Sequence, residues 1–435
     1  MRNYLLAGAA FIAVGSLLSV GARAQSPVFP VDSTAGKLDG AAPGSVTVTL
    51  GGRIFSAIEF QGGTGNNGPD QRSNPQLFSY IRLYPSFDYA NPSGVHFGVA
   101  IEIRTGAGFA GSQQGVGSES NTLGVFSGQG YVSSDRFGKF AFGTANDAID
   151  QLGVGVGDDF GTGGFFGEYG WVNSPIWMMA DAYDGDIPKQ KLAYYSPSFA
   201  GFTLGVSYQP TSVGLSNAGD LTDNGATGSA FATATGAQSR NRIEGAAQYA
   251  HAFGPVAVKA DVGYAHAEVS KSAEALADGL NYQDVSMVNV GGQLNFAGFE
   301  LEASVNTGKF AYNYNDSGSP MGPSLQGAHN TTAYIAGVGY TFGPYSIGAQ
   351  YYGVQFDQGD FGLSNSAGTL QTGHSGRLDG VAVGGSYTVG PGVSVNFDFA
   401  DNETKTPGGL QTLQNGGTAT TTHGTLLGIG TYINW

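Results

Sequence analysis

One segment of the chain is rich in both acidic and aromatic side chains. It runs from about 147 to 187, is rich in glycine, and holds two of the three tryptophans. Carboxylates in such number can create a local negative field or bind hard cations, because carboxylate oxygens are the ligands that these cations prefer. The candidate site residues of this segment are Asp158, Asp159, Glu168, Asp181, Asp184 and Asp186.

The last three of these acids suggest a calcium site. The stretch Asp181-x-x-Asp184-Gly185-Asp186 offers oxygen donors on a loop with a glycine, which suits Ca²⁺. Its spacing does not match an EF-hand loop, and no glutamate closes it. Calcium therefore stays a secondary hypothesis, and we predict neither a metal site nor a cofactor.

Catalytic patterns are absent from the sequence. The six histidines lie in separate segments, and neither an H-E-x-x-H nor a G-x-S-x-G motif occurs. Distant residues can still meet in a folded barrel, so an enzyme remains an alternative. We predict a protein without enzymatic activity.

The basic candidates are Arg53, Arg82 and Arg104, and each lies in a stretch where apolar and polar residues alternate. In the first stretch, Ile54 and its apolar neighbours fall on one face and Arg53 on the other. An arginine facing lipid would cost up to several kcal/mol, so the charged face must look into water. A simpler interpretation is that the arginines form structural ion pairs there. Their acidic partners would be Glu59, Asp88 and Glu102.

Stretches of this kind recur along the chain, joined alternately by short aromatic-glycine turns and long polar loops. This pattern is typical of a transmembrane β-barrel. An even number of strands brings both ends of a barrel to one side, and sixteen strands enclose an aqueous channel. We predict an all-β, 16-stranded antiparallel barrel with strands near 45–60, 76–90, 94–105, 122–134, 139–146, 189–197, 201–210, 241–252, 255–268, 285–296, 299–309, 332–342, 345–356, 377–389, 392–402 and 423–435.

Alternation alone would also suit a soluble β-sandwich with its charged face outside. The N-terminus favours export to a membrane, because Arg2, an apolar stretch and Ala22-Arg23-Ala24 form a signal-peptide pattern. Cleavage after Ala24 would remove two arginines and change the net charge from −15 to −17. We predict a signal peptide over 1–24, an extended segment over 25–43 and the barrel over 44–435, with 147–187 as a long loop within it.

Composition excludes several classes of function. The chain has no cysteine, which rules out a disulfide framework and thiolate metal sites. Its net negative charge makes it a poor ligand for nucleic acid, which is bound through cations that replace phosphate counterions. The mean hydropathy of −0.09 and the many Gly, Phe and Tyr residues suit a barrel with a polar interior and aromatic girdles.

The chain resembles the general diffusion porins of Gram-negative bacteria. The resemblance covers the whole mature chain. It rests on the sixteen inferred strands, the terminal aromatic Trp435, the long acidic third loop, and the segment Tyr195-Ser196-Pro197-Ser198-Phe199-Ala200-Gly201-Phe202, which looks like the strand-turn-strand after that loop. The family's fold implies a homotrimer of water-filled barrels in the outer membrane, each narrowed by a third loop folded into its lumen.

The resemblance also implies where the pore is narrowest. In the family, loop carboxylates face a row of basic side chains on the wall. The matching wall positions here are Arg53, Arg82 and Arg104. On the loop, Asp158, Asp159 and Glu168 are the first choices, and Asp181, Asp184 and Asp186 the second.

The resulting hypothesis is an outer-membrane porin for passive diffusion of small hydrophilic solutes and ions. Opposed charges across a narrow mouth create a transverse field that favours polar solutes. The expected partners are further copies of the chain, outer-membrane lipid, lipopolysaccharide and the solutes. The alternatives are a solute-specific channel, an adhesive or structural barrel without a channel, and a soluble exported β-protein.

Overall fold

The computed structural model describes most of the chain from Ala41 onward. The described residues are 41–63, 75–105, 123–154, 190–211, 237–271, 281–312, 321–322, 324, 326–357, 375–406 and 420–435. Within these ranges, no helix has the length and apolar character needed to cross a bilayer.

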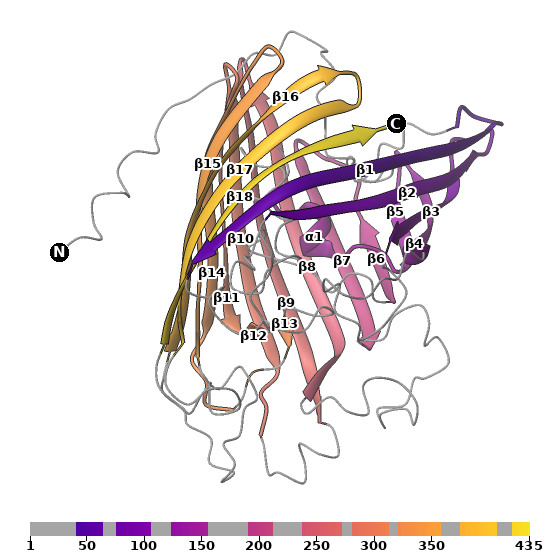
Figure 1. The fold of residues 1–435 in the computed structure, drawn as a ribbon. Coiled ribbons are helices and arrows are strands. Elements are labelled where there is room, and N and C mark those ends of the chain that lie inside the picture. The colour runs from indigo at the N-terminus through magenta and orange to yellow at the C-terminus, as the bar shows by residue number, and fades with distance from the viewer. Residues whose placement is uncertain are drawn as a thin grey trace.

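Sixteen antiparallel strands form a closed barrel (Figure 1). Each is hydrogen-bonded to its neighbours in sequence order, and β1 closes the ring with β18. The strands are β1 (Val46–Gly63), β2 (Gln76–Ala90), β3 (His96–Thr105), β4 (Leu123–Ser134), β5 (Gly138–Gly143), β6 (Lys191–Tyr195), β7 (Phe202–Thr211), β8 (Ala237–Phe253), β9 (Val256–Lys271), β10 (Val285–Phe296), β11 (Phe299–Lys309), β14 (Thr331–Phe342), β15 (Tyr345–Asp357), β16 (Ser375–Gly390), β17 (Val393–Thr406) and β18 (Thr420–Asn434).

These strands confirm the predicted architecture. The bounds of β2, β10 and β11 agree with the prediction to the residue, while β8, β9 and β17 extend further on the long-loop side. The strand β5 ends at Gly143, three residues earlier than predicted, because a left-handed φ of 103° at this glycine turns the chain away. A small separate sheet, β12 (Ala311–Tyr312) with β13 (Met321–Gly322), was not predicted.

The last residue helps to close the barrel. Trp435 and Gly52 of β1 exchange backbone hydrogen bonds of 3.1 Å in both directions. A Cβ on Gly52 would collide with the indole ring of Trp435, so only glycine lets this ring lie against β1. The terminal aromatic thus covers the seam between the first and last strands.

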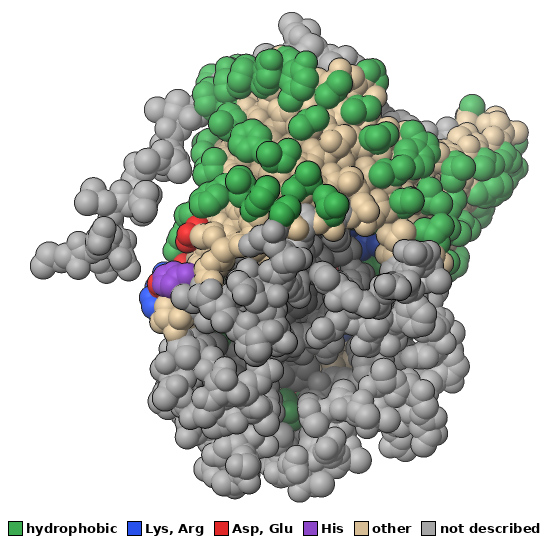
Figure 2. Space-filling model, in the orientation of Figure 1, with side chains coloured by type: hydrophobic (Ala, Val, Ile, Leu, Met, Phe, Trp, Pro, Cys, Tyr) green, Lys and Arg blue, Asp and Glu red, His purple; other side chains and the backbone are tan. Residues whose placement is uncertain are grey.

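The strand residues alternate between two different faces. On β1, the side chains of Ile54, Ile58 and Phe60 are exposed, whereas Arg53 and Glu59 are buried. Figure 2 shows apolar side chains over the strands that face the viewer, with backbone and uncharged polar or glycine residues between them. This apolar surface suits contact with lipid tails, and the alternation predicted from the sequence is confirmed.

A short helix identifies the inner face. Helix α1 (Ala148–Leu152) follows β5 and contacts β6, β7, β8 and β9 (Figure 1). It packs on the strand face that carries Ser207, Glu244 and Asp261. When the cross-strand pairs are followed from β7 through β6, β5, β4, β3 and β2 to β1, the residues on this same face include Arg104, Arg82 and Arg53. The predicted basic side chains therefore line the inside of the barrel.

Candidate functional site: the inner wall of the barrel

The three predicted arginines form a single row on the inner wall. Arg53 of β1 is the cross-strand partner of Arg82 of β2, and Arg82 is the partner of Arg104 of β3. Side chains paired in this way on one face start about 5 Å apart. The structure thus brings together the basic residues that the sequence predicted and places them at one level of the barrel.

Aromatic rings and one carboxylate hold this arginine row. The Arg53 guanidinium lies 4.7 Å from the ring centroid of Tyr432 and donates to the Tyr80 hydroxyl at 3.3 Å. Arg82 lies 4.5 Å from the Tyr80 ring centroid. Cation–π contacts and hydrogen bonds fix long side chains that would otherwise sample many rotamers. The row is therefore a preorganised positive surface.

The carboxylate in this row is Glu102, which is 1% exposed. It pairs with Arg104 and lies 4.0 Å from Arg82 Nε. The two arginine side chains keep 15% and 12% of their surface open. The structural ion pairs considered for these arginines are thus confirmed for Glu102.

Asp88 has other partners. His96 Nδ1 lies 2.8 Å from its Oδ2, the Tyr131 hydroxyl donates to its Oδ1 at 2.9 Å, and the Ala41 N–H donates to its Oδ2 at 2.8 Å. The idea that Asp88 neutralises an arginine is not supported by these contacts. Instead, Asp88 ties the start of the described chain to β2, β3 and β4.

The acidic half of the predicted constriction lies outside the described residues. This holds for Asp158, Asp159, Glu168, Asp181, Asp184 and Asp186, and also for the calcium hypothesis on the last three. Among the residues that are described, no group of three or more His, Cys, Asp or Glu side chains is placed to hold a metal ion. The loop acids therefore stay a prediction.

The first residues of the long loop are described, and they turn onto the inner wall. The Asp147 side chain caps α1 by accepting a hydrogen bond of 2.9 Å from the Asp150 N–H. The Tyr195 hydroxyl donates to the carbonyl oxygens of Asn146 and Asp147 at 2.8 and 3.3 Å. A cap of this kind stabilises a helix start by about 1 kcal/mol. The loop thus begins with an ordered turn of helix rather than with an extended chain.

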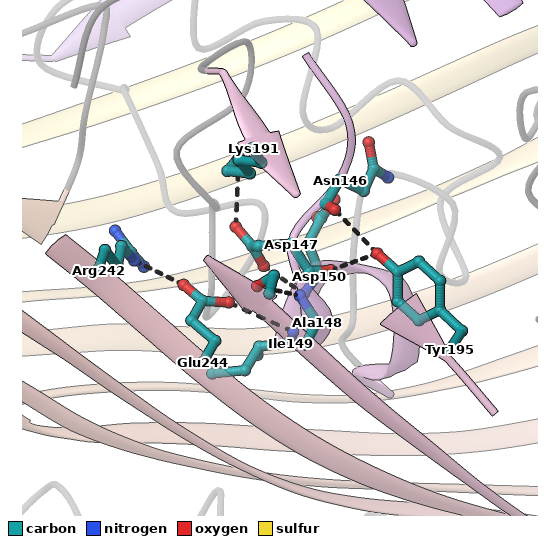
Figure 3. A network of polar contacts seen from close by, with 10 residues as sticks. Asn146, Asp147, Ala148, Ile149, Asp150, Lys191, Tyr195, Arg242 and Glu244 are labelled. Atoms are coloured by element: carbon teal, nitrogen blue, oxygen red, sulfur yellow. Dashed lines mark hydrogen bonds and ion pairs between the residues drawn. The ribbon is translucent and has the colours of Figure 1, made fainter. Parts of the chain in front are cut away.

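A buried ion pair anchors this turn (Figure 3). Lys191 Nζ of β6 lies 3.6 Å from Asp147 Oδ2, and both side chains are only 1% exposed. Burial by itself would raise the pKa of the Asp147 carboxyl. The charges of Lys191 and Arg242 and the hydrogen bond from the Asp150 N–H outweigh this and hold the pKa below its usual value.

A second buried pair supports the helix from β8. Arg242 Nε lies 2.5 Å from Glu244 Oε1, and the other Glu244 oxygen accepts from the Ile149 N–H at 3.5 Å. Figure 3 shows Glu244 between Arg242 and the first turn of α1. Because the first N–H groups of a helix lack partners within the helix, an acceptor from the wall satisfies one of them. The pair is not among the site residues predicted from the sequence, although the i, i+2 spacing of Arg242 and Glu244 on a strand indicates that both side chains face the same side.

The residues after α1 are also held by the wall. The Val154 N–H donates to Asp261 Oδ1 of β9 at 2.8 Å, and Gln248 Nε2 of β8 donates to the Leu152 carbonyl oxygen at 2.7 Å. Together with the Ala148 N–H, which donates to Ser207 Oγ at 3.0 Å, these bonds fix both ends of the helix. The chain therefore enters the barrel at a defined position.

Glycines on the wall make room for the apolar side of α1. A Cβ on Gly205 of β7 would lie 2.8 Å from Leu152 Cδ1, and one on Gly263 of β9 would lie 2.7 Å from Ile149 Cγ1. Both distances are too short for carbon atoms in contact. Ile149 and Leu152 are 1% and 3% exposed and belong to one buried cluster with wall residues of β6, β8, β9 and β10. Gly205 and Gly263 thus leave room for the helix to pack on the wall, and we call this packing site the seat of α1.

Another part of the inner wall is apolar, which the sequence analysis did not predict. Strands β14 to β18 bury one cluster of side chains that points inward and also includes Phe55, Ala57 and Tyr80. Its members on β14 to β18 are Ala333, Ile335, Tyr352, Val354, Phe356, Leu378, Ala382, Ala400, Leu426 and Tyr432. The composition suggested a polar interior, and the structure shows that the inner wall is polar in part and apolar along β14 to β18.

An apolar outer surface around an inner wall with fixed charges defines a membrane channel of the β-barrel class. A family model described as Gram-negative porin matches residues 8–407, and the chain belongs to this family. It is accordingly an outer-membrane β-barrel and a porin channel. No curated protein matches it in sequence.

Solved porin-like structures share the fold. The trimer form of OmpT, an outer membrane protein of Vibrio cholerae, is 16% identical with a TM-score of 0.51, and the alignment covers 90% of this chain and 100% of that one. A mutant of the Rh. blastica porin is 13% identical with a TM-score of 0.50, covering 89% and 100%. At such identities the likeness concerns the fold alone.

Proposed function

We propose that this porin lets small hydrophilic solutes and ions diffuse passively through a water-filled lumen. The observation that carries the proposal is the row formed by Arg53, Arg82 and Arg104 at one level of the inner wall. Fixed cations at a low-dielectric wall orient water and polar solutes, while an apolar solute gains nothing there. Selection is then by size and polarity, and the proposal includes no catalytic step.

The opposing charge would come from the long loop. We assign this role first to Asp158, Asp159 and Glu168, and then to Asp181, Asp184 and Asp186. The direction in which α1 leads the chain, onto the inner wall, supports a loop that continues inside the barrel. The resulting constriction would carry a transverse field between acids and arginines.

We further propose that the channel works as a homotrimer in contact with lipid and lipopolysaccharide. A groove on the outer side of β3, β4 and β5 supports close packing of subunits, because its walls are apolar and its floor is glycine. It is lined by Val99, Ile101, Val125 and Phe142 around Gly128 and Gly130. The related fold of OmpT has a trimer form, which agrees with this proposal.

The decisive experiment is a recording from planar bilayers that contain the detergent-purified mature protein, under a KCl gradient. Ohmic steps that close in threes would support a trimeric channel, and the reversal potential would report the sign of its selectivity. Liposome swelling with sugars of increasing size would then measure the cutoff for passive diffusion. Saturating flux for one sugar would favour a solute-specific channel instead.

Silent bilayers, despite correctly folded protein, would contradict the proposal. Folding is checked independently, because intact barrels migrate differently on gels before and after heating. A folded but silent barrel would favour an adhesive or structural role, and assays for lipid or peptide hydrolysis would test an enzyme. N-terminal sequencing of the same preparation tests the predicted signal peptide, with Gln25 expected as the first residue.

A further inference from the structure

Charged side chains interrupt the outer, lipid-facing surface on β16 and β17. Arg377 and Asp379 of β16 share this face with the exposed Val381. Their cross-strand partners on β17 are Lys405 for Arg377 and Glu403 for Asp379. The four side chains therefore form two rows, one of two cations and one of two acids.

The two acids are held by neighbouring donors. Arg377 Nη2 donates to Asp379 Oδ1 at 2.8 Å, and the hydroxyls of Tyr334 and Tyr351 donate to the same oxygen at 2.8 Å each. On the next strand, Glu403 pairs with Lys405.

One more contact completes the acidic row. His423 Nε2 of β18 lies 3.3 Å from Glu403 Oε2. Both carboxylates thus have two or more partners. The ion pairs of Asp379 with Arg377 and of Glu403 with Lys405 hold the two cationic side chains in defined positions.

The position of the rows along the strands places them at the membrane surface. Aromatic rings of Phe342, Tyr345 and Tyr387 pack at the short-turn end, with centroids 5.3 and 5.1 Å apart, as in an interfacial girdle. From Tyr387 to Arg377 a strand rises about 33 Å, which gives about 25 Å of height at a tilt of about 40°. This equals the usual height of the apolar band, so the cations lie at its other edge.

That edge belongs to the outer leaflet. The ends of β15 and β16 near the cations are joined by residues 358–374, whereas the opposite end of β16 is joined to β17 by residues 391–392. Long loops of outer-membrane barrels are extracellular and short turns periplasmic. Figure 2 shows acidic, basic and histidine side chains together where the apolar surface ends.

The cation row is suited to an anion. The side chains of Arg377 and Lys405 are 48% and 56% exposed although each has an acidic partner. Two cations directly opposite each other repel, and an anion that spans both relieves this repulsion. Phosphate fits best, because arginine binds it through two parallel N–H groups and lysine through its point charge. At this level of the membrane the available phosphates are those of lipid headgroups.

We propose that Arg377 and Lys405 form a binding site for a phosphate group of an outer-leaflet lipid headgroup. The site extends the partners considered above and rests on the outer-membrane placement, not on the channel activity. It would fix one lipid against β16 and β17 while its acyl chains lie on the apolar surface formed by Val381 and its neighbours.

The test uses the purified full-length barrel and lipid A that carries both of its phosphates. Native mass spectrometry would count the lipids retained, and the same lipid without phosphates serves as the ligand control. The double variant Arg377→Gln/Lys405→Gln is expected to weaken retention about tenfold or more, which corresponds to losing one or two charge-assisted contacts. Lys309→Gln is the matched protein control, because Lys309 is an exposed cation on the outer face of β11 at the same end.

Several outcomes would overturn the site. Equal loss in Lys309→Gln, or equal retention of the phosphate-free lipid, would mean nonspecific attraction. Binding that disappears with a chelator and requires Asp379 and Glu403, but not the cations, would assign it to a bridging divalent ion. If the double variant does not fold, Lys405→Gln alone carries the test. Bilayer conductance should be unchanged throughout, so failure of this site is distinguishable from failure of the channel.

Discussion

The inner wall carries charge in two regions that differ in their access to water. On β1 to β3, the side chains of Arg82 and Arg104 remain 12% and 15% exposed. At the seat of α1, the side chains of Lys191 and Asp147 are each 1% exposed. Charges that water and solutes can reach influence which solutes pass through the channel. Fully buried charges instead fix the position of protein segments, because leaving a buried charge unpaired costs several kcal/mol. The first region therefore suits selection and the second suits positioning.

The strongest way to break this contrast is to remove one partner of the buried pair. Lys191→Met should destabilise the barrel or release α1 at a cost of about 3–5 kcal/mol, because Asp147 is left as an uncompensated buried charge. The temperature and the urea concentration at which the heat-modifiable folded form is lost measure this. Lys191→Met with Asp147→Asn should recover part of the loss, since neither charge remains. A single variant as stable as the wild type would show that the pair does not position the loop.

A smaller effect is expected when the seat of α1 is narrowed without changing charge. Gly263→Ala places a methyl group 2.7 Å from Ile149 Cγ1, and overpacking of this kind costs about 1–3 kcal/mol. Gly245→Ala on β8 is the matched control, because nothing lies within 4 Å of its Cβ position. Urea unfolding of both variants tests the seat, and equal midpoints would contradict it.

Acid should weaken the anchor only below the ordinary carboxyl range. The pKa of Asp147 is lower in the folded protein than in the unfolded chain, where it is about 3.9. Its contribution to stability is therefore complete above about pH 4 and lost as the pH falls through the folded-state value. Comparing unfolding of the wild type and Asp147→Asn between about pH 2 and 6 tests this. The difference between the two proteins should be constant above pH 4 and shrink below it.

A substitution in the row of Arg53, Arg82 and Arg104 should change the ion selectivity of the channel more than the stability of the barrel. Arg82→Gln removes a cation from the lumen and should shift the reversal potential toward cations, by about threefold in permeability ratio, because salt screens partly exposed charges. Unfolding should change by less than about 1 kcal/mol.

The opposite shift is expected from the loop. Replacing Asp158 and Asp159 by Asn and Glu168 by Gln should favour anions, and an unchanged reversal potential would remove these acids from the constriction.

Much of this architecture could be predicted from the local alternation of apolar and polar residues in the sequence. The period-two alternation placed Arg53, Arg82 and Arg104 on the watery face, because a charge in lipid is too costly to tolerate. The same pattern located sixteen strands, since apolar positions and aromatic-glycine turns mark where each strand runs and ends. The seat of α1 was not readable, because Gly205 and Gly263 look like ordinary strand glycines until Leu152 and Ile149 lie against them.

The alternation of apolar and polar residues in the sequence therefore determines which face of each strand contacts lipid and which faces water. Which charges meet is a matter of register around the closed ring, and register depends on turn geometry and on pairing between strands far apart in the sequence. Only that pairing aligns the three arginines in one row, joins Lys191 to Asp147, and sets Arg377 beside Lys405. The direction of each side chain follows from the free-energy cost of placing a polar group in lipid, which acts at every strand residue separately. Which residues become neighbours across strands depends on the register of the complete, closed barrel.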